Sequence, residues 1–176
     1  NNIQCIGETS YLQDSVRQSN ILGLIESKDF KKNDVCSKLL SLDVSYREKV
    51  PFSHLKNVDK TLANYLLVGL IARTWPEAKI IHMKRSPLDQ IISAWKSRFA
   101  NGHNFTLELN DLVKVYISYS KLMDFWEDEF GTRIFKCQYE DLVNNMDVET
   151  KKIAKYCGIN WTHKMLKPME SKLLIK

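Results

Sequence analysis

Lys84 and Arg85 are adjacent cations that lie between a short apolar run, residues 80–83, and a helix-start signal at Ser86. The run contains β-branched residues, which predicts a buried strand. Open α/β sheets bind their ligands at the carboxyl ends of strands, which is where these cations lie. A guanidinium offers phosphate oxygens a planar fork of donors, and a hydroxyl such as that of Ser93 can add another. The spacing therefore predicts an anion site that suits a phosphate.

The helix that must follow this site has three start signals. Ser86 is a favourable N-cap, Pro87 suits the first helical position, and Asp89 can accept a hydrogen bond from the backbone N–H of the cap. Ser93 lies seven residues beyond the cap, about 10 Å along a helix. Arg85 therefore reaches Ser93 only by folding back along the helix. The apolar face of this helix comprises Leu88, Ile91, Ile92, Trp95 and Phe99.

Two further strand ends carry charged residues. Residues 3–6 are apolar and are soon followed by Glu8. An extended stretch at residues 55–58 is followed by Lys60 and by a helix predicted over residues 62–74. A carboxylate at a helix start is favoured by the helix dipole, and a lone lysine is ordinarily a solvated surface residue. From these residues alone, Glu8 and Lys60 can have either a structural or a functional role.

The remaining pattern is that of a helix-rich α/β chain. Strands are expected near Ile3, Leu55, Ile80 and Ile134, and each precedes a helix, as in parallel β-α units. Further helices are predicted over residues 34–49, 107–130 and 146–157. The aromatic residues of the second of these fall at helical spacing, which indicates core positions. We expect one three-layer α/β domain with a mainly parallel central sheet.

Composition excludes several classes of protein. The net charge of +5 suits a polyanionic small ligand but is too weak to indicate a nucleic-acid-binding protein. No apolar run approaches the length of a membrane span, and no signal peptide is visible. The four cysteines are far apart and form no CxxC, so no zinc site is expected and a reducing compartment is favoured.

The glycines exclude two common nucleotide-binding motifs. A P-loop and a dinucleotide-binding fingerprint both need glycines a few residues apart, because backbone amides must approach the phosphates. The six glycines of this chain, at positions 7, 23, 69, 102, 131 and 158, are too widely spaced for either motif.

The anion site resembles the 3'-phosphate-binding element of sulfotransferases that use 3'-phosphoadenosine 5'-phosphosulfate (PAPS). The likeness rests on Arg85 at the end of a strand, the Pro-x-Asp that follows, and Ser93 eight residues after the arginine. It is greater to the bacterial and tyrosylprotein branch than to the cytosolic phenol and steroid enzymes, and it spans about residues 7–161. The resemblance implies the P-loop-NTPase-like sulfotransferase fold. Three further stretches resemble the family in their residues and in their order along the chain: residues 70–73, 76–82 and 139–142.

The resemblance also implies roles for five residues. Glu8 would be the general base that takes the proton of an acceptor hydroxyl, and Lys60 would stabilise the bridging oxygen and the departing phosphate. Arg85 and Ser93 would hold the 3'-phosphate, and Tyr139 would lie against the adenosine. The implied reaction is in-line transfer of a sulfuryl group from PAPS to an acceptor hydroxyl, without a metal. A protein tyrosine, a glycan and a small alcohol all fit as the acceptor.

Some features of the family are missing from these residues. A proline is more usual within residues 61–63. The 5'-phosphosulfate loop of the family is expected upstream of Asn1, and its basic closing loop beyond Lys176. We therefore expect residues 1–176 to be a single sulfotransferase-like domain within a longer chain. A cytoplasmic location is expected, with the Golgi lumen as the alternative.

Three alternative interpretations are open: a different catalytic base, a nucleotide-binding domain without catalysis, and a protein-interaction domain. His54 is a second candidate base, but it lies 31 residues before Arg85, which is too early for the family pattern. A non-catalytic phosphonucleotide-binding domain would need Arg85 but not Glu8. A protein-interaction domain would use the aromatic helix at residues 107–130 and the basic tail at residues 164–176.

Overall fold

The computed structural model describes residues 3–51, 56–97 and 104–167, which fall into two compact units. Unit 1 is Asn1–Ala78 and unit 2 is Lys79–Lys176. Each unit contains a pair of parallel strands and several helices, so the predicted helix-rich α/β class is confirmed. The expectation of one domain within a longer chain stays a prediction. His54, Phe99 and residues 168–176 lie outside the described residues.

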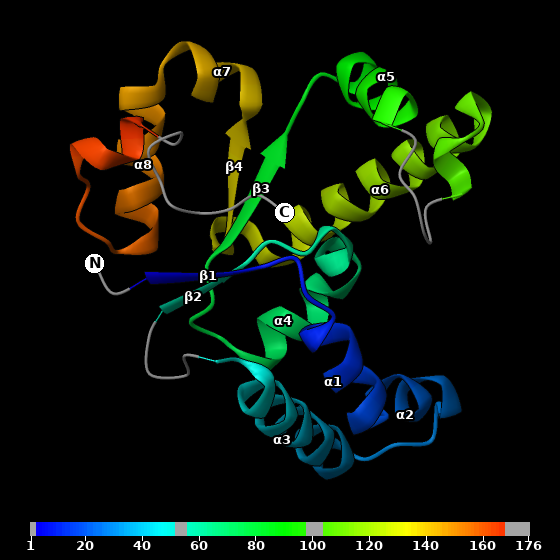
Figure 1. Ribbon diagram of the computed structural model, residues 1–176. Coiled ribbons are helices and arrows are strands. Elements are labelled where there is room, and N and C mark those ends of the chain that lie inside the picture. The colour runs from blue at the N-terminus through cyan, green and yellow to red at the C-terminus, as the bar shows by residue number, and fades with distance from the viewer. Residues whose placement is uncertain (1–2, 52–55, 98–103, 168–176) are drawn as a thin grey trace. The chain divides into compact units, whose positions relative to one another are not determined.

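Unit 1 alternates strands and helices. Its two strands lie side by side and pair in parallel, with Ile3 opposite Lys56 and Gly7 opposite Asp59 (Figure 1). Because parallel strands end at the same edge of a sheet, the residues after Gly7 and after Asp59 lie close together. The elements are β1 (Ile3–Gly7), α1 (Tyr11–Ser19), α2 (Ile21–Ser27), α3 (Lys32–Lys49), β2 (Lys56–Asp59), the 3-10 helix η1 (Leu62–Leu67) and α4 (Val68–Thr74).

The core of unit 1 lies between its helices. α1 packs against α3, and the apolar side chains of each recur every three or four residues, which places them on one face. The buried members are Leu12, Val16, Ile21 and Leu42, and the partly buried side chains packed against them are Leu39, Tyr46, Leu67, Leu70, Ile71 and Trp75.

The helix predicted over residues 62–74 begins as the 3-10 helix η1 and becomes α-helical only in α4. At this tight start the backbone N–H of Asn64 donates to the carbonyl of Thr61 over 3.1 Å. The side chain of Asn64 donates to Asp59 Oδ1 over 2.9 Å. The tighter turn therefore accompanies a side-chain contact that apolar periodicity does not encode.

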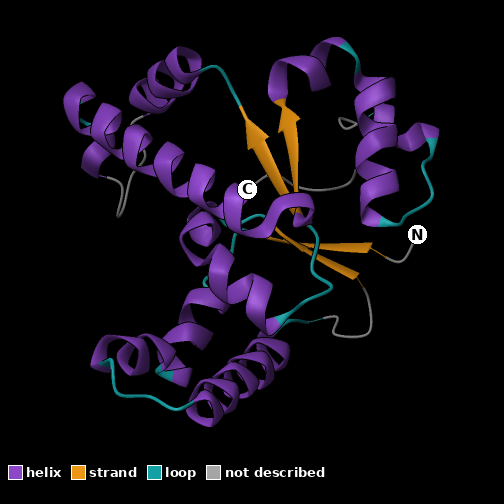
Figure 2. Ribbon diagram, turned by 180° about the vertical axis from the view of Figure 1, so that it is seen from behind, coloured by secondary structure: helices purple, strands orange, loops and turns teal. Residues whose placement is uncertain are grey.

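Unit 2 repeats the order of strand and helix. β3 and β4 pair in parallel without a register shift, from Ile80 opposite Ile134 to Lys84 opposite Gln138, and both views show them side by side (Figure 2). The elements are β3 (Ile80–Lys84), α5 (Pro87–Ser97), η2 (Asn104–Thr106), α6 (Leu109–Phe130), η3 (Gly131–Arg133), β4 (Ile134–Gln138), α7 (Tyr139–Asn144), α8 (Met146–Cys157) and η4 (His163–Leu166).

The prediction that residues 80–83 form a buried strand is right for one face only. His82 is buried, whereas its neighbours Ile81 and Met83 are each 41% exposed. Side chains alternate between the two faces of a strand, so one face of β3 is covered and the other is open. The other buried residues of unit 2 are Thr106, Leu112, Met123, Ile134, Cys137 and Ala154.

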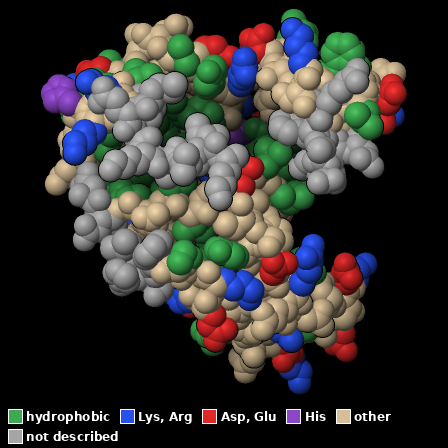
Figure 3. All heavy atoms as spheres, in the orientation of Figure 1, with side chains coloured by type: hydrophobic (Ala, Val, Ile, Leu, Met, Phe, Trp, Pro, Cys, Tyr) green, Lys and Arg blue, Asp and Glu red, His purple; other side chains and the backbone are tan. Residues whose placement is uncertain are grey.

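The surface carries charges of both signs. Over α1 to α3, on the face that Figure 3 shows, acidic and basic side chains are intermingled. Within the described ranges, no helix combines the length and the apolar character needed to cross a membrane. Nor does any group of three or more metal-ligating side chains gather in those ranges.

Candidate functional site

Gly7 ends β1 in a conformation that suits glycine. Its φ of 79° lies in the left-handed region, and no atom would meet an added Cβ within 4 Å. The requirement for glycine therefore comes from the backbone and not from crowding. The carbonyl of Gly7 accepts a hydrogen bond from the backbone N–H of Lys60 over 3.3 Å. This turn brings the next residue, Glu8, to the end of β2.

Glu8 and Lys60 form an ion pair in unit 1. The Lys60 Nζ to Glu8 Oε1 distance is 2.7 Å, although the two residues are 52 positions apart. Their side chains are 66% and 56% exposed, respectively. An ion pair this exposed contributes at most about 1 kcal/mol to stability. A gain in stability therefore does not explain why the two side chains meet. Chemically, the pair offers a carboxylate that can take a proton and an ammonium group that can offset developing negative charge.

Asp59, which directly precedes Lys60, accepts three hydrogen bonds. Its Oδ1 accepts hydrogen bonds from the backbone N–H of Thr61 (3.0 Å) and from Asn64 Nδ2 (2.9 Å). Its Oδ2 accepts one from the hydroxyl of Tyr46 (3.1 Å). Burial and the negative charge of Asp59 together raise the pKa of Tyr46, so this phenol stays protonated. Three donors thus fix the residue that directly precedes Lys60.

In unit 2, Arg85 leaves the carboxyl end of β3 and lies over an aromatic ring. Its guanidinium carbon is 5.0 Å from the centre of the Tyr139 ring, at the start of α7. Among the described residues, the buried Nε of Arg85 has no hydrogen-bond acceptor. Stacking fixes the plane of a guanidinium without using its donors, so the arrangement suits an incoming anion. Ser93, the third predicted member, is exposed on α5, two turns further on.

The partner of the helix cap differs from the one predicted. The backbone N–H of Ser86 donates to Glu140 Oε1 over 2.9 Å, whereas Asp89 was expected to accept this bond. The register explains the difference: Lys84 lies opposite Gln138, so the residues two positions beyond each of them face one another. Gln138 Nε2 donates to Glu140 Oε2 over 2.6 Å. The N–H of Ser86, followed by the N–H of Glu140 itself and by Gln138, lowers the pKa of the Glu140 carboxyl.

Replacing Glu140 with alanine should lower the thermal midpoint by a few degrees at pH 7. Because the pKa of Glu140 is lowered, its contribution is present above the unfolded value of about 4.3 and is lost as the pH falls through the folded value. Thermal unfolding at pH 7 and at pH 3 therefore measures a difference that shrinks in acid. Asp89→Ala is the control, and a larger effect from this control would favour the partner that the sequence predicted.

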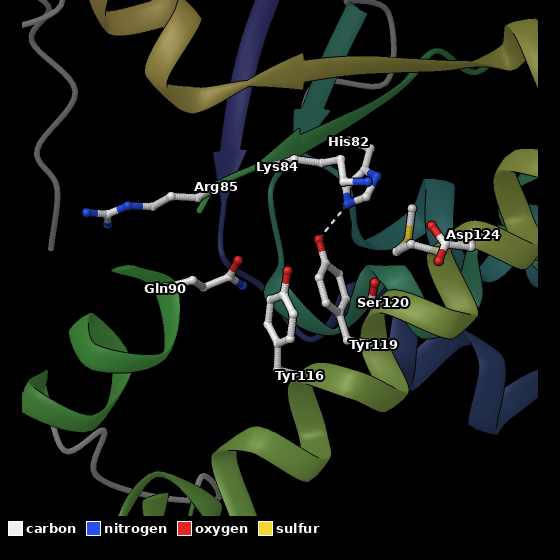
Figure 4. A pocket seen from close by; sticks show the side chains of 9 residues that line it. His82, Lys84, Arg85, Gln90, Tyr116, Tyr119, Ser120 and Asp124 are labelled. Atoms are coloured by element: carbon white, nitrogen blue, oxygen red, sulfur yellow. Dashed lines mark hydrogen bonds between the residues drawn. The ribbon is translucent and has the colours of Figure 1, made fainter. Parts of the chain in front are cut away.

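A small pocket of unit 2 adjoins the end of β3 (Figure 4). It is a shallow hollow open to solvent, and the tyrosine rings of α6 form one wall, while Arg85 extends away from them. The pocket combines cationic, phenolic and amide groups, so its chemistry is polar. The residues that line it are His82, Lys84, Arg85, Gln90, Tyr116, Tyr119, Ser120, Met123 and Asp124.

His82 is held at both ring nitrogens behind this pocket. Its Nδ1 is 2.8 Å from Glu127 Oε1, and its Nε2 is 2.5 Å from the hydroxyl of Tyr119. Lys136 Nζ lies 2.6 Å from the other carboxylate oxygen of Glu127. Burial acts to raise the pKa of Glu127, but the hydrogen bonds from Lys136 and His82 outweigh it, and the pKa is lowered. An ionised Glu127 accepts a hydrogen bond from the Nδ1–H of His82, and the hydroxyl of Tyr119 fixes the ring from its other nitrogen.

The structure thus brings four of the five predicted site residues together in two pairs, and Ser93 belongs to neither pair. Glu8 meets Lys60 in unit 1, and Arg85 meets Tyr139 in unit 2. Several supporting residues were not identified from the sequence. For Asp59 a signal exists, since an aspartate often accepts a hydrogen bond from the N–H two residues later. The others, Thr61, His82, Glu127 and Glu140, have long-range partners and no comparable local signal.

Comparisons with known proteins find likeness in family profile, in sequence and in fold. A family profile described as "Sulfotransferase family" matches residues 11–163. An uncharacterized protein of Aquifex aeolicus (strain VF5) is 28% identical over 131 residues, which are 73% of this chain and 17% of that protein. The solved sulfotransferase domain from the curacin biosynthetic pathway matches with a TM-score of 0.55 and 16% identity, over 92% of this chain and 59% of that one. The structural match concerns the fold alone and confirms the predicted fold. The chain spans less than two thirds of either protein.

Proposed function

Because the chain belongs to the sulfotransferase family, we propose that it transfers a sulfuryl group from PAPS to an acceptor hydroxyl by in-line displacement. The observation that carries this proposal is the 2.7 Å contact between Glu8 and Lys60. The family resemblance implies a general base at Glu8 and a charge-stabilising role for Lys60, and both roles need the two side chains at one place. The contact joins residues 52 positions apart in the chain, so it depends on the fold and not on local sequence.

In the proposed reaction, PAPS supplies the sulfuryl group, and the residues of unit 1 manage proton and charge. Glu8 accepts the proton of the acceptor hydroxyl as the acceptor oxygen bonds to sulfur. Lys60 offsets the charge on the oxygen that keeps the electron pair when its bond to sulfur breaks. Each side chain exchanges its present partner for a reacting atom. The exposure of Glu8 suits an acceptor that arrives from solvent, and a protein tyrosine, a glycan and a small alcohol all meet that condition.

The residues of unit 2 are proposed to hold the nucleotide part of the donor. Arg85 and Ser93 would bind the 3'-phosphate, and Tyr139 would contact the adenosine. Two features support a fit: a guanidinium already oriented by an aromatic ring, and a buried Arg85 Nε without an acceptor among the described residues. A dianionic phosphate supplies the acceptors that this nitrogen lacks.

The donor site is tested by calorimetric titration of adenosine 3',5'-bisphosphate, with adenosine 5'-monophosphate as the ligand control. Arg85→Ala should weaken bisphosphate binding about 10- to 100-fold, because it removes hydrogen bonds to a charged group. Arg17→Ala, which removes an exposed arginine of α1 paired with Asp14, should leave the affinity unchanged. A folded protein that binds the bisphosphate no more tightly than the monophosphate would contradict the donor site.

A further inference from the structure

Thr61 makes two hydrogen bonds to the residue that follows Glu8. Its Oγ1 accepts from the backbone N–H of Thr9 over 3.0 Å and donates to the carbonyl of Thr9 over 2.9 Å. Both bonds cross the 52 positions that separate the two loops. A hydroxyl has one donor and two acceptor sites, so one side chain can satisfy both backbone groups.

The same residue is anchored on the β2 side. The backbone N–H of Thr61 donates to Asp59 Oδ1 over 3.0 Å, and the backbone N–H of Lys60 donates to the carbonyl of Gly7 over 3.3 Å. Every residue that flanks Glu8 and Lys60 is therefore fixed by a hydrogen bond.

The ion pair itself contributes little to fixing the backbone around Glu8 and Lys60. Its two side chains are long and more than half exposed, and such pairs gain little from their attraction. Thr61, by contrast, is partly buried and bonds to backbone atoms, whose positions move less than those of charged side-chain tips. Beyond the pairing of β1 with β2, Thr61 therefore ties the residue after Glu8 to the residue after Lys60.

We infer that Thr61 is a positioning residue that holds the Glu8 carboxylate and the Lys60 ammonium group in place for transfer, an inference that rests on the proposed function. Thr61 does not touch the reacting atoms. Its hydroxyl fixes the backbone of Thr9, the residue next to Glu8. A misplacement of about 1 Å in a reacting group can cost about 100-fold in rate, so the loss of this bridge is visible in catalysis.

The test compares Thr61→Val, which keeps the shape but loses the hydroxyl, with Thr61→Ser, which keeps the hydroxyl. With PAPS and 4-nitrophenol as acceptor, we expect kcat to fall about 10- to 100-fold in Thr61→Val while KM for PAPS stays within about twofold. Thr61→Ser should stay within about threefold of the unsubstituted protein. Thr74→Val is the matched control, because the buried Thr74 Oγ1 has no hydrogen-bond partner among the described residues.

A second readout does not depend on sulfuryl transfer. Amide hydrogen exchange of Thr9 should be about 5- to 10-fold faster in Thr61→Val and restored in Thr61→Ser, because the Thr9 N–H loses the hydroxyl that accepts its hydrogen bond. Unchanged exchange at Thr9, or an unchanged kcat in Thr61→Val, overturns the inference. If the unsubstituted protein neither binds the bisphosphate nor turns over PAPS, the proposed function fails, and hydrogen exchange alone decides whether Thr61 orders the pair.

Discussion

Replacing Glu8 with glutamine is expected to lower kcat by about 10²- to 10⁴-fold, which is the usual contribution of a general base. The amide keeps the size of the side chain, and its oxygen can still accept a hydrogen bond from Lys60 Nζ, which lies 2.7 Å from the carboxylate. It cannot take a proton from an acceptor hydroxyl. Steady-state kinetics with saturating PAPS and a phenolic acceptor measure the loss.

Binding provides the control for this prediction. Glu8→Gln should bind adenosine 3',5'-bisphosphate as the unsubstituted protein does, since the proposed role of Glu8 concerns the acceptor hydroxyl and not the nucleotide. Glu26→Gln, at an exposed position of α2, should leave both kcat and binding unchanged. A Glu8→Gln protein that keeps full transfer activity would exclude Glu8 as the base. If no variant, the unsubstituted protein included, transfers a sulfuryl group while all of them bind the bisphosphate, a non-catalytic nucleotide-binding domain is favoured.

Replacing Glu127 with alanine should reduce the free energy of unfolding by about 3 kcal/mol at pH 7, because it leaves a buried imidazole and a lysine without their shared carboxylate. The side chains of Glu127 and His82 are 8% and 6% exposed, whereas Lys136 is 59% exposed and can be hydrated again. The expected loss therefore lies at the lower end of the range for broken buried pairs. Urea unfolding followed by circular dichroism gives the value.

The pH dependence separates this role from simple packing. The pKa of Glu127 is lowered, so its contribution to stability is present above the unfolded value of about 4.3 and is lost as the pH falls through the folded value. The difference between the unsubstituted protein and Glu127→Ala should shrink accordingly in acid. Glu129→Ala, on the same helix and exposed, should change stability by less than about 0.5 kcal/mol. A loss from Glu127→Ala that does not vary with pH would point to lost packing.

Local sequence signals predicted the elements that carry the site better than the contacts within it. The strand predicted over residues 80–83 and the helix predicted to begin at Pro87 follow from β-branched residues and helix-start chemistry, and the structure confirms both as β3 (Ile80–Lys84) and α5 (Pro87–Ser97). The prediction of Asp89 as the acceptor for the Ser86 amide was wrong, because it rested on a local pattern of residues. The true acceptor, Glu140, reaches this amide only through the pairing of β3 with β4, which no local pattern encodes.

The same limit applies to the supporting residues. His82 lies in the apolar run of residues 80–83 and Glu127 in the helix predicted over residues 107–130, and no local pattern links the two positions. Their contact spans 45 positions and depends on how α6 lies against β3. Thr61 was noted only for its place in a turn where a proline is more usual. The roles of Glu8, Lys60, Arg85, Ser93 and Tyr139 came from resemblance, and these roles stay predictions.

The parallel pairing of β1 with β2 has a consequence for how the protein acquires its reactive pair. Between the two strands lies the helical segment α1 to α3, so a long loop must close before Gly7 and Asp59 become neighbours. Loop closure costs conformational entropy that only the completed contacts offset, and pairings between distant residues therefore form slowly and late in folding. We therefore expect the ion pair of Glu8 and Lys60 to form only after β1 has paired with β2, and a partly folded chain to hold the two charged residues apart.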